Sequence, residues 1–152
     1  MHELNTGSVR ANNVLFHYLT MGEGPMLLCL HGFPDHACSF HRQLRGFSAL
    51  GYRVVAPLSY YRCAFGSATQ INAHAALQRR IGTEPIPVPC LYLHGEQDGC
   101  ISYSVARNMA ELFPGGFERH VIPGLGHFLH LEAPDKLNAV IAGCLKAAVK
   151  QE

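Results

Sequence analysis

The sequence predicts an α/β fold, with a mostly parallel sheet flanked by helices in one compact domain. Short, continuously apolar runs, such as residues 26–30 and 90–93, are typical of strands buried on both faces of a parallel sheet. These runs alternate with longer stretches of mixed polar and apolar residues that suit helices. The chain has 152 residues and 48% of them are hydrophobic, which is enough apolar material for a core.

The first third is expected to hold three strand regions and one helix: a β-hairpin over residues 9–20, strands over 26–30 and 52–56, and a helix over 41–50. Asn12 and Asn13 can form the hairpin turn, because asparagine tolerates a positive φ. Gly51 directly follows the expected helix, at a position where glycine commonly ends helices in the left-handed conformation.

The remainder begins with an unclear segment, residues 58–80. Residues 83–89 follow, and their three prolines exclude regular structure. Beyond them strands and helices alternate again: strands over 90–93 and 117–122, an amphipathic helix over 102–113, and a final helix from 134 to about 150. Pro134 suits the first turn of that final helix, because its fixed φ is already helical.

Composition and charge exclude several classes of function. The formal net charge is +1 and no block of Lys and Arg is present, so a nucleic-acid-binding face is not expected. No apolar run reaches the ~20 residues of a membrane span. The N-terminus lacks a secretory pattern, so the six cysteines, without a C-x-x-C pair, predict free thiols in the cytoplasm. No cofactor or metal is expected, because His127 and His130 alone are too few for a zinc site.

Polar residues suited to chemistry follow the expected buried strands. Residues 28–35 and 91–98 both read L-x-L-H-G-x-x-D, so each is a strand that runs into a glycine turn with an aspartate just past it. Residues 124–127, GLGH, follow the last expected strand and place His127 on a loop. Because sites in open α/β sheets form beyond the carboxyl ends of the strands, these turns hold the candidate functional residues.

In chain order, these segments resemble the α/β-hydrolase superfamily, and specifically its epoxide-hydrolase-like branch. HGFPD at 31–35 resembles the oxyanion-hole motif, and GYRVVAP at 51–57 resembles the strand after the first helix. LYLHGEQDG at 91–99 resembles the turn that carries the triad acid. PGLGHFLHLEAPDKLN at 123–138 resembles the catalytic-histidine turn and the final helix. The resemblance implies a truncated α/β-hydrolase-like fold.

The resemblance implies roles for five residues. His127 would be the catalytic base, Asp98 the acid that orients it, and the backbone N–H of Phe33 would belong to the oxyanion hole. Asp35 and Tyr61 would bind substrate, Tyr61 as a lid tyrosine that polarises an epoxide oxygen. The residues alone leave simpler alternatives open: a loop histidine bonded to a carbonyl, capping or turn roles for the two aspartates, and aromatic packing for the tyrosine.

The nucleophile is unknown. The family carries it in G-x-S-x-G or G-x-D-x-G, and neither pattern occurs here. At residues 57–58 the chain joins directly where the family has a central block, so the nucleophile elbow and most of the lid are absent from the sequence. Residues 1–57 would then carry the oxyanion turn, 58–89 a residual lid or linker, and 90–152 the acid and histidine. A water activated by the histidine could substitute, or one of four side chains: Cys38, Ser39, Ser67 and Ser102.

These features predict a hydrolase with weak carboxylesterase activity. The small-molecule substrate would be a small ester or an epoxide. The alternative is a non-catalytic remnant of the fold or an interaction module, which the missing nucleophile favours. The absent block also removes the neighbours of the strands at 26–30 and 90–93, and unpaired strand edges readily pair with another chain. We therefore expect a homodimer, with domain swapping as one route to it.

Overall fold

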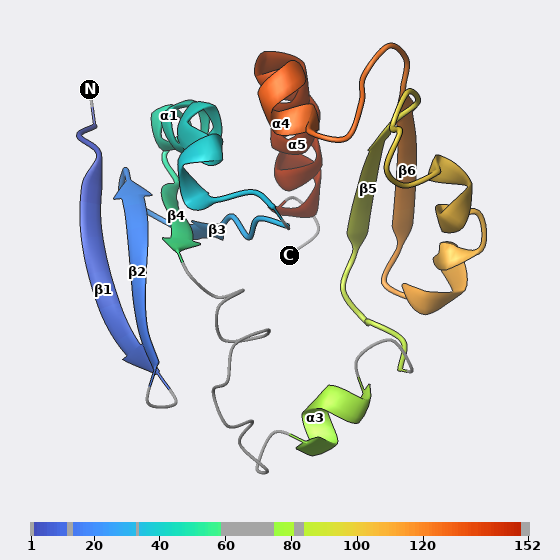
Figure 1. Cartoon of the computed structure of the whole chain (residues 1–152), viewed down its shortest axis with the longest axis horizontal. Helices are drawn as coiled ribbons and strands as arrows, with labels where there is room; N and C mark the ends of the chain where they lie inside the picture. Colours follow the sequence, from blue (N-terminus) through green and yellow to red (C-terminus); the bar gives the residue numbers. More distant parts are fainter. Residues whose placement is uncertain (1, 12–13, 33, 59–74, 81–83, 150–152) are drawn as a thin grey trace. The chain divides into compact units, whose positions relative to one another are not determined.

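The computed structural model describes residues 2–11, 14–32, 34–58, 75–80 and 84–149 (Figure 1). The chain divides into two compact units, one formed by Met1–Ala68 with Ala133–Glu152 and the other by Thr69–Glu132. Each unit combines a β-sheet with helices, so the α/β class predicted from the sequence is confirmed.

The sheet of the first unit has four strands in the order β1-β2-β4-β3: β1 (Asn5–Ala11), β2 (Val14–Met21), β3 (Met26–Leu28) and β4 (Arg53–Leu58). β2 pairs antiparallel with both β1 and β4, and β3 pairs parallel with β4. The prediction of a mostly parallel sheet is therefore wrong for this unit. The predicted hairpin causes the difference, because strands joined by a tight turn must run in opposite directions, whereas β3 and β4 are joined through a helix.

The core of the first unit lies between its sheet and two helices, α1 (His41–Ala49) and α5 (Pro134–Val149). Leu44 and Phe47 are three residues apart on α1, share one face, and are each 1% exposed. They pack with Met21 of β2 and Val54 of β4, and α5 covers the cluster with Ile141, Ala142 and Leu145. Burying a side chain of this size contributes ~1.5–3 kcal/mol, so this cluster holds α1 on the sheet. Both predicted helices are confirmed.

Gly51 ends α1 as the sequence predicts. Its φ is +87°, and its N–H donates to the carbonyl oxygen of Ser48 at 3.1 Å. The next N–H, of Tyr52, reaches back to the carbonyl of Phe47 at 3.1 Å, and the two aromatic rings pack edge to face with centroids 6.5 Å apart. This is a Schellman motif with its hydrophobic contact, and it turns the chain from α1 directly into β4.

The second unit is built on two parallel strands, β5 (Cys90–Gly95) and β6 (Phe117–Ile122). Both predicted strands are confirmed, and β5 runs two residues further than the apolar run suggested. Two short helices, α3 (Ala75–Arg80) and α4 (Leu129–Glu132), belong to the same unit. The turns that follow β5 and β6 leave the same end of the sheet, because parallel strands end on the same side.

The predicted amphipathic helix over residues 102–113 is wrong. Two single-turn 3₁₀ helices stand there, η3 (Tyr103–Ala106) and η4 (Met109–Leu112). The hydroxyl of Ser102 accepts from the N–H of Ser104, and Asn108 adopts φ −112° and ψ 18° between the two turns. Short polar side chains of this kind compete with the regular helical hydrogen bonds, which breaks the helix that the apolar spacing predicts.

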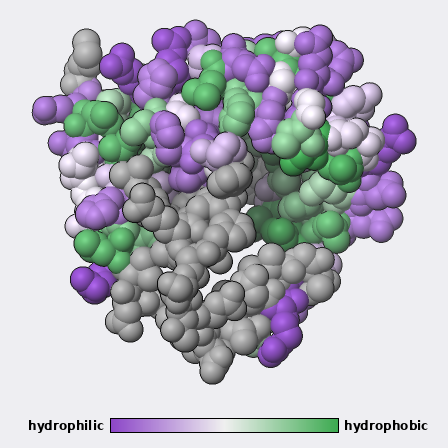
Figure 2. All heavy atoms as spheres, in the orientation of Figure 1, coloured by the Kyte–Doolittle hydropathy of each residue, from purple (hydrophilic) through white to green (hydrophobic). Residues whose placement is uncertain are grey.

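Hydrophilic and hydrophobic side chains are both present on the surface shown in Figure 2. β3 is an edge strand, and its Met26 and Leu28 are 61% and 49% exposed. Among the described residues, no helix has both the length and the apolar character to cross a bilayer. The expected homodimer concerns assembly, and it stays a prediction.

Two glycine substitutions should change stability in opposite directions. At Gly51 an added Cβ meets no atom within 4 Å, so Gly51→Ala costs only the positive φ, and we expect a loss of about 1 kcal/mol. Gly143 lies within α5 and its Cβ also meets nothing, so Gly143→Ala should add about 0.5–1 kcal/mol. Urea unfolding measures both. Equal shifts for the two variants would contradict the left-handed cap.

Candidate functional site

Asp98 lies in the turn that follows β5, and its first carboxylate oxygen is held by the backbone. Oδ1 accepts from the N–H groups of Cys100 at 2.8 Å and Ile101 at 2.9 Å. The N–H of Asp98 itself donates to the carbonyl of Gly95 at 3.2 Å, which closes the turn. An aspartate that binds the backbone two and three residues ahead is a common turn former, so the turn role, one alternative from the sequence, is present.

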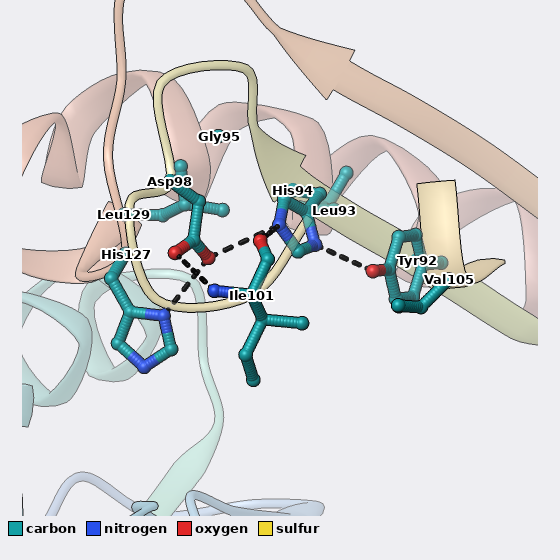
Figure 3. Close-up of a pocket in the computed structure, with 9 residues that line it drawn as sticks. All are labelled: Tyr92, Leu93, His94, Gly95, Asp98, Ile101, Val105, His127 and Leu129. Atoms are coloured by element: carbon teal, nitrogen blue, oxygen red, sulfur yellow. Dashed lines mark hydrogen bonds and ion pairs between the residues drawn. The ribbon is translucent and has the colours of Figure 1, made fainter. Parts of the chain in front are cut away.

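The second carboxylate oxygen faces His127. The distance from Asp98 Oδ2 to His127 Nδ1 is 2.9 Å, so the contact expected from the sequence is present (Figure 3). A carboxylate only accepts, and therefore Nδ1 carries the hydrogen and Nε2 of the neutral ring carries the lone pair. The Asp98 side chain is 5% exposed and that of His127 is 32% exposed. The pair thus combines a buried acid with a base that reaches solvent.

The loops of Asp98 and His127 are held together through their backbones. Gln97 donates its N–H to the carbonyl oxygen of Leu125 at 2.8 Å. At Gly95, an added Cβ would collide with the carbonyl oxygens of Leu125 and Gly126. Only glycine allows so close an approach of the two chains. The glycine of the L-H-G turn therefore brings the acid within reach of the histidine.

Glu132, which the sequence analysis did not identify, clamps the histidine loop. Its Oε2 accepts from the N–H of Gly126 at 2.6 Å, and its Oε1 accepts from the N–H of Phe128 at 3.0 Å. These two amides flank His127 on either side. The contact to Phe128 resembles a capping box, in which a glutamate of the first helical turn reaches back to the start of its helix. One carboxylate thereby holds the backbone on both sides of the candidate base.

His94 was also not identified. It is 8% exposed on β5, and its Nε2 lies 3.1 Å from Oδ2 of Asp98 and 2.9 Å from the carbonyl oxygen of Ile101. Its Nδ1 lies 2.5 Å from the hydroxyl of Tyr92 (Figure 3). The repeated L-x-L-H-G-x-x-D pattern was the available signal, because it pairs a histidine with each of the two turn aspartates.

The hydrogen bonds from Ile101, Cys100 and His127 keep Asp98 ionised. The N–H of Ile101 is the largest of the influences that hold the pKa of Asp98 at about 2, below its ordinary 3.8. Burial acts in the opposite direction and raises the pKa, whereas the His127 ring and the N–H of Cys100 lower it further. Asp98 is therefore a carboxylate, and an acceptor for histidine, at any pH well above about 2.

Three further residues were predicted to bind substrate or the oxyanion: Phe33, Asp35 and Tyr61. Asp35 belongs to the first unit and bonds within its own turn, where it accepts from the N–H of His36 at 2.8 Å and from the hydroxyl of Ser39 at 2.9 Å. These bonds lie in the turn before the 3₁₀ helix at Ala37–Phe40, whose cap residue is His36 and which has no side-chain cap bond. The predicted oxyanion residue Phe33 and the predicted lid tyrosine Tyr61 lie outside the described residues.

Of the four candidate substitute nucleophiles, Ser102 is the one that lies in the described part of the second unit. Its hydroxyl caps η3 and lies 2.9 Å from the hydroxyl of Ser104. Ser39 and Cys38 belong to the first unit, on the 3₁₀ turn η1 (Ala37–Phe40). Ser67 lies outside the described residues.

A pocket of about 340 Å³ adjoins the acid–histidine pair. Figure 3 shows the side chains of Asp98, His94 and His127 turned toward one another at this pocket. Apolar side chains line the rest of it: Leu93, Ile101, Val105 and Leu129. Among the described residues, no group of three His, Cys, Asp or Glu side chains is placed to hold a metal. The geometry therefore offers proton transfer at His127 beside a mainly apolar space.

Comparison with known proteins relates this chain to epoxide hydrolases. A segment of 57 residues is 39% identical to Epoxide hydrolase 1 of Siraitia grosvenorii, and it covers 38% of this chain and 18% of that protein. The chain thus matches only about a fifth of the length of this curated relative. No family model matches the chain.

The fold is shared with solved hydrolases. The crystal structure of epoxide hydrolase VrEH1 from Vigna radiata superposes with a TM-score of 0.72 at 16% identity, over 95% of this chain and 98% of that one. A predicted CIB-like hydrolase from Thermoplasma acidophilum gives a TM-score of 0.71 at 14% identity, over 97% and 100% of the two chains. The chain therefore has the α/β-hydrolase fold and distant epoxide hydrolase homologues, which confirms the resemblance seen in its motifs.

Removing the Glu132 clamp should loosen the histidine loop. In Glu132→Ala both amides lose their acceptor, and in Glu132→Gln one of two carboxylate oxygens is replaced by a donor. We expect faster hydrogen exchange at the N–H groups of Gly126 and Phe128, measured by NMR, and a stability loss of no more than about 1 kcal/mol, because Glu132 is exposed. Glu118→Ala is the control, since Glu118 is exposed and bonds the His120 ring. Unchanged exchange in Glu132→Ala would contradict the clamp.

The pKa of Asp98 predicts a pH-dependent contribution to stability. Its folded pKa of about 2 lies below 3.8, so ionised Asp98 favours the folded state above pH 4, and this contribution is lost as the pH falls toward 2. The difference in urea midpoint between the unmodified chain and Asp98→Asn should therefore shrink between pH 4 and pH 2. Asp135→Asn is the matched control, because Asp135 is 84% exposed. A difference that stays constant down to pH 2 would contradict the lowered pKa.

Proposed function

We propose that this chain is a hydrolase of small activated carboxylic esters in which His127 acts as a general base toward water. The observation that carries the proposal is the 2.9 Å hydrogen bond between Asp98 Oδ2 and His127 Nδ1. It fixes the tautomer that leaves a lone pair on Nε2, which is the arrangement that a general base requires. Kinship with epoxide hydrolases supports hydrolysis as the class of reaction.

The reaction follows from that arrangement. Nε2 of His127 takes one proton from a water molecule while the water oxygen bonds to the carbonyl carbon of the ester. The tetrahedral intermediate then breaks its bond to the leaving group, which departs as a phenoxide or similarly stable anion, and the carboxylic acid remains. The His127 imidazolium gives its proton to solvent, which restores the base. Ionised Asp98 stabilises the imidazolium that forms in between.

Water is the proposed attacking group because the sequence holds no nucleophile elbow. This choice also favours activated esters over epoxides. An activated ester releases a stable anion without help, whereas an epoxide oxygen needs a proton donor as the ring opens. Tyr61, by resemblance, is the residue proposed for that donor role, and Phe33 is proposed to supply an N–H to the developing oxyanion.

A non-catalytic interaction module is the second candidate function. The missing nucleophile favours it, because a retained histidine–aspartate pair can persist as a structural hydrogen bond. The apolar lining beside the pair fits either a small ester or a segment of a partner. Hydrolysis of esters that depends on His127 would favour the first proposal, and its absence would favour the second.

The proposal is tested with p-nitrophenyl acetate and pure protein. We expect slow hydrolysis that falls by about 10²-fold in His127→Ala, since a general base contributes ~10²–10⁴-fold. His120→Ala is the matched control, because His120 is an exposed histidine that also bonds a carboxylate, Glu118 at 2.6 Å. Equal rates in all three proteins would mark surface catalysis and favour the interaction module.

Pre-steady-state kinetics test the water step. Direct attack by water forms no acyl-enzyme, so p-nitrophenol should appear linearly from the first turnover. A burst equal to the protein concentration would show a covalent intermediate and overturn this step, while leaving His127 as the base.

A further inference from the structure

His94 is a buried titratable side chain that the proposed reaction does not use. It is 8% exposed on β5, four residues before Asp98. Both of its ring nitrogens have partners within the second unit. A buried histidine with both nitrogens satisfied is held in one orientation.

The partners of His94 determine its tautomer. Nε2 lies 2.9 Å from the carbonyl oxygen of Ile101, which only accepts, so Nε2 carries a hydrogen. Nε2 also lies 3.1 Å from Oδ2 of Asp98, an electrostatic contact in addition to the hydrogen bond to Ile101. Nδ1 of the neutral ring then accepts from the hydroxyl of Tyr92 at 2.5 Å. Burial raises the pKa of Tyr92, which keeps that hydroxyl protonated, although nearby Arg119 lowers it.

His94 adds a polar contact on the histidine side of Asp98. Oδ1 accepts two backbone N–H groups, and Oδ2 accepts the N–H of His127 and lies 3.1 Å from Nε2 of His94. The positive end of the His94 N–H dipole beside Oδ2 favours this orientation of the ionised carboxylate. Without His94, the carboxylate group can rotate about its Cβ–Cγ bond with less resistance.

We infer that His94 is a positioning residue that aims Oδ2 of Asp98 at Nδ1 of His127, with Tyr92 holding the His94 ring from its other side. The inference rests on the proposed function in one respect: Asp98 and His127, which His94 positions, are the proposed acid–base pair. His94 acts through Asp98, so its effect falls on the tautomer and orientation of the His127 ring.

The other L-x-L-H-G-x-x-D segment lies in the first unit. There, Nδ1 of His31 lies 3.0 Å from the carbonyl oxygen of the adjacent Gly32. Asp35 accepts from the N–H of His36 and from the hydroxyl of Ser39. In the second unit, Tyr92 bonds the His94 ring and the loop of His127 contacts Asp98.

The test compares three substitutions of His94. His94→Gln places an amide N–H close to the position of Nε2, so it keeps a polar N–H beside Oδ2 of Asp98. His94→Leu removes that N–H. His94→Asn keeps a polar group near Tyr92 but is too short to reach Asp98, and it serves where the leucine variant does not fold. Tyr92→Phe removes the hydroxyl that holds the ring, and His120→Gln is the control on an exposed histidine.

The readout is ¹⁵N and ¹H NMR of the His127 ring, which does not require activity. In His94→Leu and His94→Asn we expect mixed tautomers of His127 and about 10-fold faster exchange of its Nδ1 hydrogen, the effect of weakening one hydrogen bond of ordinary strength. His94→Gln should restore the spectrum, Tyr92→Phe should give a smaller change of the same kind, and His120→Gln should give none. An unchanged His127 spectrum in both His94→Leu and His94→Asn would overturn the inference.

Activity separates this inference from the proposed function. Where esters are turned over, His94→Leu should lower kcat by up to about 10²-fold with little change in KM, because a displaced base affects the chemical step. If His127→Ala leaves turnover unchanged while the NMR of the His94 variants changes as expected, the proposed function fails and the positioning role stands. A fall in KM and kcat together, with an unchanged His127 spectrum, would mark a structural role and overturn the inference.

Discussion

The candidate site depends on one carboxylate, that of Asp98. Three N–H groups donate to it, two from the backbone of its own turn and one from the His127 ring, and Nε2 of His94 lies 3.1 Å away. An ionised side chain that is only 5% exposed would be costly without such donors. With these donors the pKa of Asp98 lies at about 2. The ionised carboxylate therefore connects the turn that follows β5 to the histidine loop through hydrogen bonds.

Backbone and side chains divide the task of building this site. The backbone sets the distance between the loops, because Gly95 permits the close approach and Gln97 bonds Leu125. Side chains then set orientation, since Glu132 holds the amides on both sides of His127. Parallel pairing of β5 and β6 places both loops at one end of the sheet, which is the reason that two residues 29 positions apart in the chain can meet.

Features that depend on local sequence patterns could be predicted, whereas features that depend on partners distant in the sequence could not. The apolar run at 90–93 predicted β5, the mixed polar and apolar pattern at 41–50 predicted α1, and the motif around His127 predicted its contact with Asp98. The strand order of the first sheet could not be read, because the hairpin's neighbour is chosen by packing rather than by its own residues. Glu132 is an exposed glutamate, and its local sequence gives no sign of the two amides that it binds.

The exposure of the pair also constrains what it can do. His127 is oriented by a buried acid, yet its side chain is 32% exposed and its ring bonds no hydroxyl or thiol within the described part of the second unit. A base aimed at solvent meets water at bulk concentration but gains none of the advantage of a nucleophile held in place, which can be worth ~7–11 kcal/mol of barrier. The same orientation that makes proton transfer feasible therefore limits the rate, and the substrates within reach are those whose leaving group is already stable.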